Sequence, residues 1–148
     1  MILSVLSLYW AVQFRATALM PSLTVWVVDF DGKIPPYETS NAIVGPTVTD
    51  VAGKIITSTT NRLGYTIKSA EDFNNDPLAV RQSVYNEHAW AAIVVNPNAT
   101  SLLRGALSNG ITSYDPNGAG EIVTITARDE NTYATSVQPA LSQFEHAV

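Results

Sequence analysis

The chain has 148 residues, which suits a single domain whose apolar core is large enough to fold without disulfides or metal ions. Charged residues make up 14% of the sequence, against roughly 25% in an average soluble domain, and the formal net charge is −5. The eight Lys and Arg residues are not clustered, so we expect no nucleic-acid partner. Cysteine is absent, which excludes disulfides, thiolate metal sites and thiol nucleophiles.

The N-terminal segment MILSVLSLYWAVQF carries no charge, and Arg15 follows it. A membrane-spanning helix needs about 20 apolar residues, so this segment is too short to cross a bilayer alone. Tyr9, Trp10 and Arg15 resemble the aromatic and basic residues that mark a membrane–water interface. We interpret residues 1–18 as the second half of a transmembrane or anchor helix. A buried amphipathic helix and a secretory signal cleaved between Arg15 and Ser22 are the alternatives.

Downstream of this segment, strand-like and helix-like patterns alternate. Apolar and β-branched runs predict four strands, at residues 23–30, 65–68, 90–96 and 121–127. Start and stop signals predict four helices. The first begins at Gly45-Pro46 and is capped at Gly64, the second begins at Asp76-Pro77, and the third runs from Asn98 to Asn109-Gly110. The fourth runs from 131 to 148, with a kink at Pro139. This order predicts an α/β fold, with a mostly parallel sheet of about four strands and alternating helices behind a partial transmembrane-like helix.

Each of the first three helices has an apolar face that we expect to pack on the sheet. The faces are Val48, Val51, Ile55 and Ile56 on the first helix, Val80, Val84 and His88 on the second, and Leu102, Leu103, Ala106 and Leu107 on the third. No internal repeat or change in composition marks a second domain. We therefore assign residues 1–18 to the anchor helix and residues 22–148 to one α/β domain.

The strand-and-turn segment LTVWVVDFDG, residues 23–32, resembles the first motif of haloacid-dehalogenase-type phosphatases. In such an enzyme Asp29 would be the nucleophile and Asp31 the general acid, with magnesium bound nearby. The other required parts are missing, because no lysine stands at a later strand–helix junction and no acidic pair follows a later strand. We therefore expect Asp29 and Asp31 to end a strand and shape a turn.

Other candidate residues indicate structural roles. His88 and His146 lie at the ends of separate helices, with no carboxylate partner fixed by spacing. The GAG at 118–120 lacks the flanking strand and helix of a dinucleotide site. Trp26 and Trp90 lie in predicted strands, where core packing is the expected use. We therefore expect no catalytic residue, no cofactor-binding residue and no metal site.

Asn98, Ala99 and Thr100 form an N-glycosylation acceptor at a predicted strand–helix turn, where the surface is accessible. Asn98 is therefore a candidate glycosylation site. Asn is also a favourable helix N-cap, and this structural role of Asn98 is an equal alternative.

The chain contains the segments SLYWAVQF, LTVWVVDFDG, VGP, LGYTI, DPLAVRQSVYNEHAWAAIVVNPNAT, ALSNGITSYDP and Y…VQPAL. Together they resemble the fungal nitrosoguanidine-resistance protein family over nearly the whole chain, most strongly between Asp76 and Thr100. Proteins of that family are similar to bacterial ABC-type permeases with a large extracytoplasmic domain, related to the phage-infection protein.

The resemblance implies a domain that faces the outside or a lumen, in the plasma membrane or secretory pathway, between a first transmembrane helix and several later ones. A sequon at Asn98 agrees with that location. Compared with the family, the chain lacks the first half of the leading helix and ends at Val148 before a later span, so we expect a truncated member. The family supplies no catalytic residues to carry over.

Two functions from different classes are therefore expected. The preferred one is a non-catalytic extracytoplasmic domain of a multi-span membrane protein associated with drug or toxicant resistance or transport. Its partners would be membrane lipid through the N-terminal helix, and other subunits or copies of the protein. The alternative is a small magnesium-dependent phosphatase that uses Asp29 and Asp31. Loop residues Tyr114, Asp115 and Asn117 are the candidates for a surface role, because loops on a rigid scaffold usually carry binding.

Overall fold

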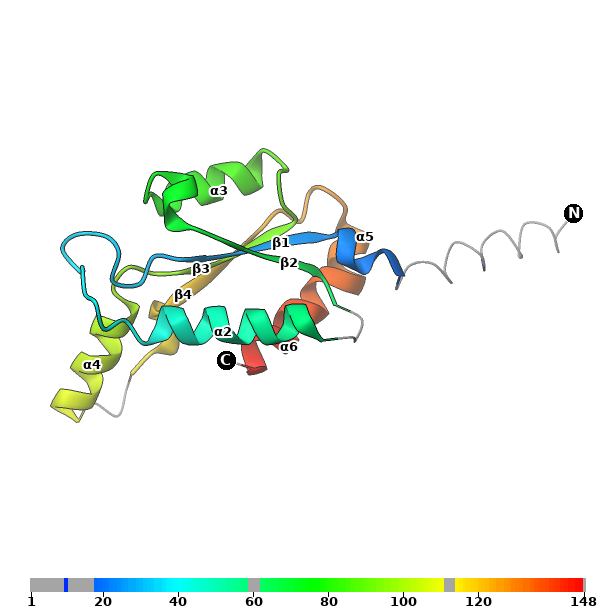
Figure 1. Cartoon of the computed structure of the whole chain (residues 1–148). Coiled ribbons are helices and arrows are strands. Elements are labelled where there is room, and N and C mark those ends of the chain that lie inside the picture. Colours follow the sequence, from blue (N-terminus) through cyan, green and yellow to red (C-terminus); the bar gives the residue numbers. More distant parts are fainter. Residues whose placement is uncertain (1–9, 11–17, 59–61, 111–113, 148) are drawn as a thin grey trace, which may run out of the picture.

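The computed structural model describes residues 10, 18–58, 62–110 and 114–147 (Figure 1). The strands are β1 (Thr24–Asp29), β2 (Gly64–Lys68), β3 (Ala91–Val95) and β4 (Gly120–Thr124). The helices are α2 (Val44–Thr57), α3 (Pro77–Tyr85), α4 (Ala99–Asn109), α5 (Glu130–Thr132) and α6 (Gln138–Ala147). Short turns are η1 (Met20–Ser22), η2 (Ala70–Phe73), η3 (Pro116–Gly118) and the π-helical η4 (Tyr133–Val137). The four predicted strands are confirmed.

The strands form one mixed sheet in the order β2-β1-β3-β4. β1 pairs in parallel with β2 on one side and with β3 on the other, so that Val27 lies opposite both Ile67 and Ile93. β4 pairs with β3 in the antiparallel sense. The predicted α/β fold with a mostly parallel sheet of four strands is therefore confirmed.

Helices cover both faces of the sheet, with α2 and α6 on one face and α3 on the other (Figure 1). Successive residues of a strand point to opposite faces, so Val27 packs towards α2 and α6 whereas Val28 packs towards α3. All five residues of β3 are buried, which explains its continuous apolar sequence. Trp26 packs against Phe73 with ring centroids 5.5 Å apart, as expected for a tryptophan of the core.

One predicted boundary, the start of α3, agrees with the structure, and another, the end of α2, does not. The Asp76 side chain accepts a hydrogen bond from the Leu78 amide at 2.9 Å, which confirms the predicted start of α3. The predicted helix cap at Gly64 is wrong, because α2 ends at Thr57 and Gly64 opens β2. Glycine is needed there for a close approach, since an added Cβ would lie 2.1 Å from the carbonyl oxygen of Pro21.

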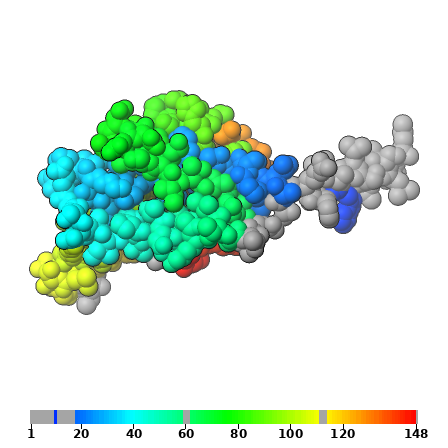
Figure 2. Space-filling view, viewed as in Figure 1, coloured from blue at the N-terminus to red at the C-terminus, as the bar shows by residue number. Residues whose placement is uncertain are grey.

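α4 differs most from the sequence prediction. The structure confirms the helix, but only Ala99 and Thr100 within it are buried. Leu102 and Leu107, predicted to pack on the sheet, are 40% and 74% exposed. Figures 1 and 2 show α4 projecting from the end of the molecule. The reason is topological: β4 returns antiparallel beside β3, so this connection needs no helix crossing the sheet.

The C-terminal region is helical from Glu130 to Ala147, as predicted. Its irregular part is η4, which ends at Val137, two residues before Pro139. Proline lacks the N–H that would bond to residue 135, so a wider π-helical turn at this point has a local cause. His88 lies beyond the end of α3 and is exposed, so the prediction that it lines that helix is wrong.

Most of the predicted anchor, residues 1–18, lies outside the described part of the chain. Within it Trp10 is helical and 68% exposed. Across the described ranges, every helix is too short or too polar to cross a membrane.

Candidate functional site

The carboxyl ends of β1 and β3 form the site at which ligands usually bind in open α/β sheets. The chain leaves β1 for β2 on one side and then returns to β3 on the other side of β1. Such a reversal of strand order opens a crevice beyond the strand ends. In this chain the residues that follow β1 and the N-termini of α2 and α4 meet there (Figure 1).

The side chain of Asp31 lies buried where these segments meet. It is 1% exposed, and its Oδ1 accepts a hydrogen bond from the Thr100 amide at 2.9 Å. Its Oδ2 accepts from the Gly45 amide at 3.0 Å and from the Thr100 hydroxyl at 2.5 Å. The carboxylate thus caps α2 and α4 together, where both helix N-termini favour a negative charge.

Thr100 completes the connection between the two helices. Its hydroxyl oxygen accepts hydrogen bonds from the Ile43 amide at 2.7 Å and from the Val44 amide at 3.1 Å. Asn98 occupies the N-cap position of α4, but its side chain makes no capping bond, so the predicted capping role is wrong. The reason is that Asp31 already takes the Thr100 amide. Glycosylation of Asn98, which is half-buried, stays a prediction.

Asp29 ends β1 beside this network and is 8% exposed. Its Oδ1 accepts from the Asp31 amide at 2.9 Å, and its Oδ2 lies 2.7 Å from the Lys33 ammonium. Lys33 also donates to the Asp29 carbonyl oxygen at 3.0 Å. A Cβ added at Gly45 would lie 1.9 Å from Asp29 Oδ1, so only glycine lets α2 approach this carboxylate. The turn after β1 is therefore held by the carboxylates of both aspartates.

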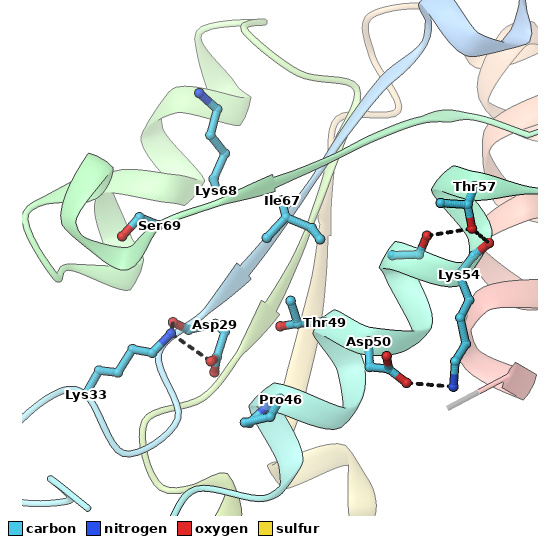
Figure 3. A pocket seen from close by; sticks show the side chains of 11 residues that line it. Asp29, Lys33, Pro46, Thr49, Asp50, Lys54, Thr57, Ile67, Lys68 and Ser69 are labelled. Atoms are coloured by element: carbon cyan, nitrogen blue, oxygen red, sulfur yellow. Dashed lines mark hydrogen bonds and ion pairs between the residues drawn. The ribbon is translucent and has the colours of Figure 1, made fainter. Parts of the chain in front are cut away.

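A groove of about 840 Å³ runs beside Asp29 between α2 and β2, and all three lysines of the chain line it (Figure 3). Lys33 points to Asp29, and Lys54 pairs with Asp50 at 2.6 Å. Lys68 points away from both pairs, and it forms no ion pair within the described residues. Two of the three lysines at this groove thus have a carboxylate partner, a buried one at Lys33 and an exposed one at Lys54.

A second groove, of about 1030 Å³, brings together several residues that the sequence analysis singled out. Tyr114, Asn117 and His146 line it, whereas His88 lies elsewhere on the surface. Asp115 instead caps η3 by accepting the Asn117 amide at 3.0 Å. In the part of the chain that is described, no three His, Asp or Glu side chains are arranged to hold a metal ion.

The sequence analysis missed the roles of Thr100 and Lys33. Lys33 had a local signal, because it stands four residues after Asp29 in the same turn. Thr100 had none, since it lies 69 residues from the carboxylate that it contacts.

The family model described as "Protein of unknown function (DUF3533)" matches residues 1–148, so the chain belongs to that family. No curated protein and no solved structure matches the chain.

Proposed function

We propose that this family member is the outward-facing domain of a multi-span membrane protein of the nitrosoguanidine-resistance type, and that the domain binds rather than catalyses. In this proposal the domain faces the cell exterior or a secretory lumen, and residues 1–18 insert into membrane lipid. Its role in drug or toxicant resistance or transport belongs to the whole membrane assembly. Ligands, other subunits or further copies of the protein are the partners.

The burial of Asp31 is the observation that carries the non-catalytic part of the proposal. Enzymes with open α/β sheets use the crevice beyond the strand ends for substrate or cofactor. Here that position holds a carboxylate that is 1% exposed and bonded to Gly45 and Thr100. A general acid must reach its substrate, so this geometry supports a structural role for Asp31.

The arrangement of the domain suits contacts at the end away from the predicted anchor. η1, which follows the predicted anchor, lies at one end of the sheet, and α4 projects at the other end (Figure 1). If the chain leaves a membrane near residue 18, α4 lies on the membrane-distal side. Contacts with ligands or subunits at that end would not compete with lipid.

The orientation can be tested by labelling a single cysteine, because the natural sequence contains none. Ser142 lies on α6 and is exposed, which makes Ser142→Cys a suitable variant. In intact yeast cells producing this variant, a membrane-impermeant maleimide should label the protein without permeabilisation. The cysteine-free parent controls for background. Labelling that requires permeabilised membranes would contradict the outward orientation.

The phosphatase alternative retains one favourable observation, since Asp29 lies at a strand end and lines a groove beside Lys33. Its test is hydrolysis of p-nitrophenyl phosphate with magnesium by the parent protein and by Asp29→Asn. Our proposal expects no difference between the two proteins. Magnesium-dependent turnover that Asp29→Asn abolishes would establish the alternative instead.

A further inference from the structure

A third groove lies between α2 and α6 and has an apolar floor. Its volume is about 480 Å³, within the range of small-molecule sites. Leu63 in the floor is fully buried, and the rings of Tyr65 and Phe144 stack with centroids 5.6 Å apart at 29°. These three side chains are buried beneath the groove, and the partly exposed apolar residues that line it are Val51, Ile55 and Ala140. The floor therefore suits an aliphatic or aromatic group.

The charged side chains that line this α2–α6 groove are both cationic. They are Lys54 from α2 and Arg62 from the segment before β2. Among the described residues that line it there is no acidic side chain, although the chain has 13 Asp and Glu against 8 Lys and Arg. The groove at Tyr114, which shares Phe144, is instead lined by Glu121 and Glu145. The two grooves therefore differ in the sign of their charge.

Both cations can take a ligand. Lys54 pairs with Asp50, but the two side chains are 72% and 65% exposed, so the pair is weak and easily exchanged. Arg62 donates one long hydrogen bond, from Nε to the Ser58 carbonyl oxygen at 3.4 Å. A guanidinium has four further N–H donors, in a planar arrangement that suits a carboxylate or similar anion.

We propose that the α2–α6 groove binds a small amphiphile with a single anionic head. The head, a carboxylate, sulfonate or phosphate monoester, lies between Lys54 and Arg62. The apolar body lies on Val51, Ile55 and Ala140, above the buried Leu63, Tyr65 and Phe144. This site is separate from the buried junction at Asp31, and it does not depend on the membrane topology proposed above.

Three probes of equal chain length test the charge preference. The full chain is titrated by isothermal titration calorimetry with dodecanoate and dodecyltrimethylammonium below their micelle concentrations, and with dodecanol below its solubility limit. Dodecanoate should bind saturably and at least about tenfold more tightly than the other two, because charge-assisted hydrogen bonds form only with the anion. Equal binding of the three probes would overturn the proposal, since the groove would then be an unselective apolar surface.

Matched variants locate the site. Lys54→Gln and Arg62→Gln should each weaken dodecanoate binding about fivefold, whereas Lys68→Gln, which removes a lysine that points away, should leave it unchanged. Asp50→Asn should strengthen binding about twofold, because it releases Lys54 from its pair. Lys54→Gln changes only an exposed side chain, so the test stands even if Arg62→Gln unfolds the end of α2. Unchanged affinity in Lys54→Gln, or concentration-dependent dimers that exclude the probe, would overturn the proposal.

Discussion

The Asp31 carboxylate accepts both the amide and the hydroxyl of Thr100, at 2.9 and 2.5 Å, across 69 residues of sequence. The same carboxylate accepts the Gly45 amide, so one buried side chain fixes the starts of α2 and α4 at the end of β1. Within the described residues, every buried polar side-chain atom has a hydrogen-bond partner. The turn after β1 is therefore a structural junction whose bonds are all made.

The close contact between α2 and Asp29 predicts opposite effects for two glycine substitutions in one helix. Gly45→Ala should destabilise the protein by about 1 to 3 kcal/mol, because its Cβ would overlap the Asp29 carboxylate. Gly53→Ala should stabilise it by about 0.5 to 1 kcal/mol, because its Cβ would enter open space and alanine favours a helix. Urea unfolding of the two variants and the parent measures both effects. Equal stability of the two variants would contradict the contact.

Replacing Asn98 separates its two suggested roles. Asn98→Gln should change the free energy of unfolding by less than about 0.5 kcal/mol, because the Asn98 side chain makes no capping bond. A true N-cap would cost about 1 kcal/mol when replaced. The same variant removes the sequon, so a glycosidase-sensitive shift of the protein made in yeast should disappear with it. A loss near 1 kcal/mol would mean that the side chain caps α4 after all.

Tyr65 predicts a loss of stability at high pH. Burial raises the pKa of Tyr65 to about 12, whereas the ordinary value is about 10. The folded state therefore holds the phenolic proton more tightly than the unfolded state. Its contribution is fully present below about pH 10 and is lost as the pH rises towards 12.

Between pH 9 and 11 this loss should be about 1 kcal/mol, because the unfolded tyrosine gives up its proton in this interval whereas the folded one keeps it. Tyr65→Phe keeps the ring beside Phe144 and removes the titrating group. The variant should lose less stability than the parent over that interval in urea titrations. Parallel pH curves for the two proteins would show that Tyr65 does not titrate differently on folding.

The exposed apolar side of α4 predicts that its leucines add little to stability. Leu107 is 74% exposed, so Leu107→Gln should change the free energy of unfolding by less than about 0.5 kcal/mol. Val84 in α3 is fully buried, and Val84→Ala should cost about 2 kcal/mol by leaving a cavity. Thermal melts of the two variants compare these positions directly. A similar cost at both positions would mean that α4 packs on the domain.

Features with local causes were predictable from the sequence. The apolar runs of β1 and β3 are continuous because both strands lie inside a sheet covered on its two faces. The start of α3 follows from a carboxylate and a proline in adjacent positions, Asp76 and Pro77. These signals depend on a few neighbouring residues, and the structure confirms them.

Features that depend on distant contacts were not predictable. The end of β1 at the aspartates was predicted, but the partners of Asp31 are Gly45 in α2 and Thr100 in α4, which lie 14 and 69 residues further along the chain. The local preference of Asn98 for capping was overridden by that carboxylate. The apolar face of α4 has the usual helical spacing, yet the antiparallel return of β4 leaves the helix off the sheet.

Removal of the Asp31 side chain shows whether this buried carboxylate holds the starts of α2 and α4 together. Asp31→Ala leaves the Gly45 amide, the Thr100 amide and the Thr100 hydroxyl without their acceptor, so we expect a loss of about 3 to 5 kcal/mol in urea unfolding. Asp76→Ala, which removes an exposed cap with one hydrogen bond, is the matched control and should cost about 1 kcal/mol. If the urea midpoint of Asp31→Ala equals or exceeds that of Asp76→Ala, the Asp31 carboxylate does not hold α2 and α4 together.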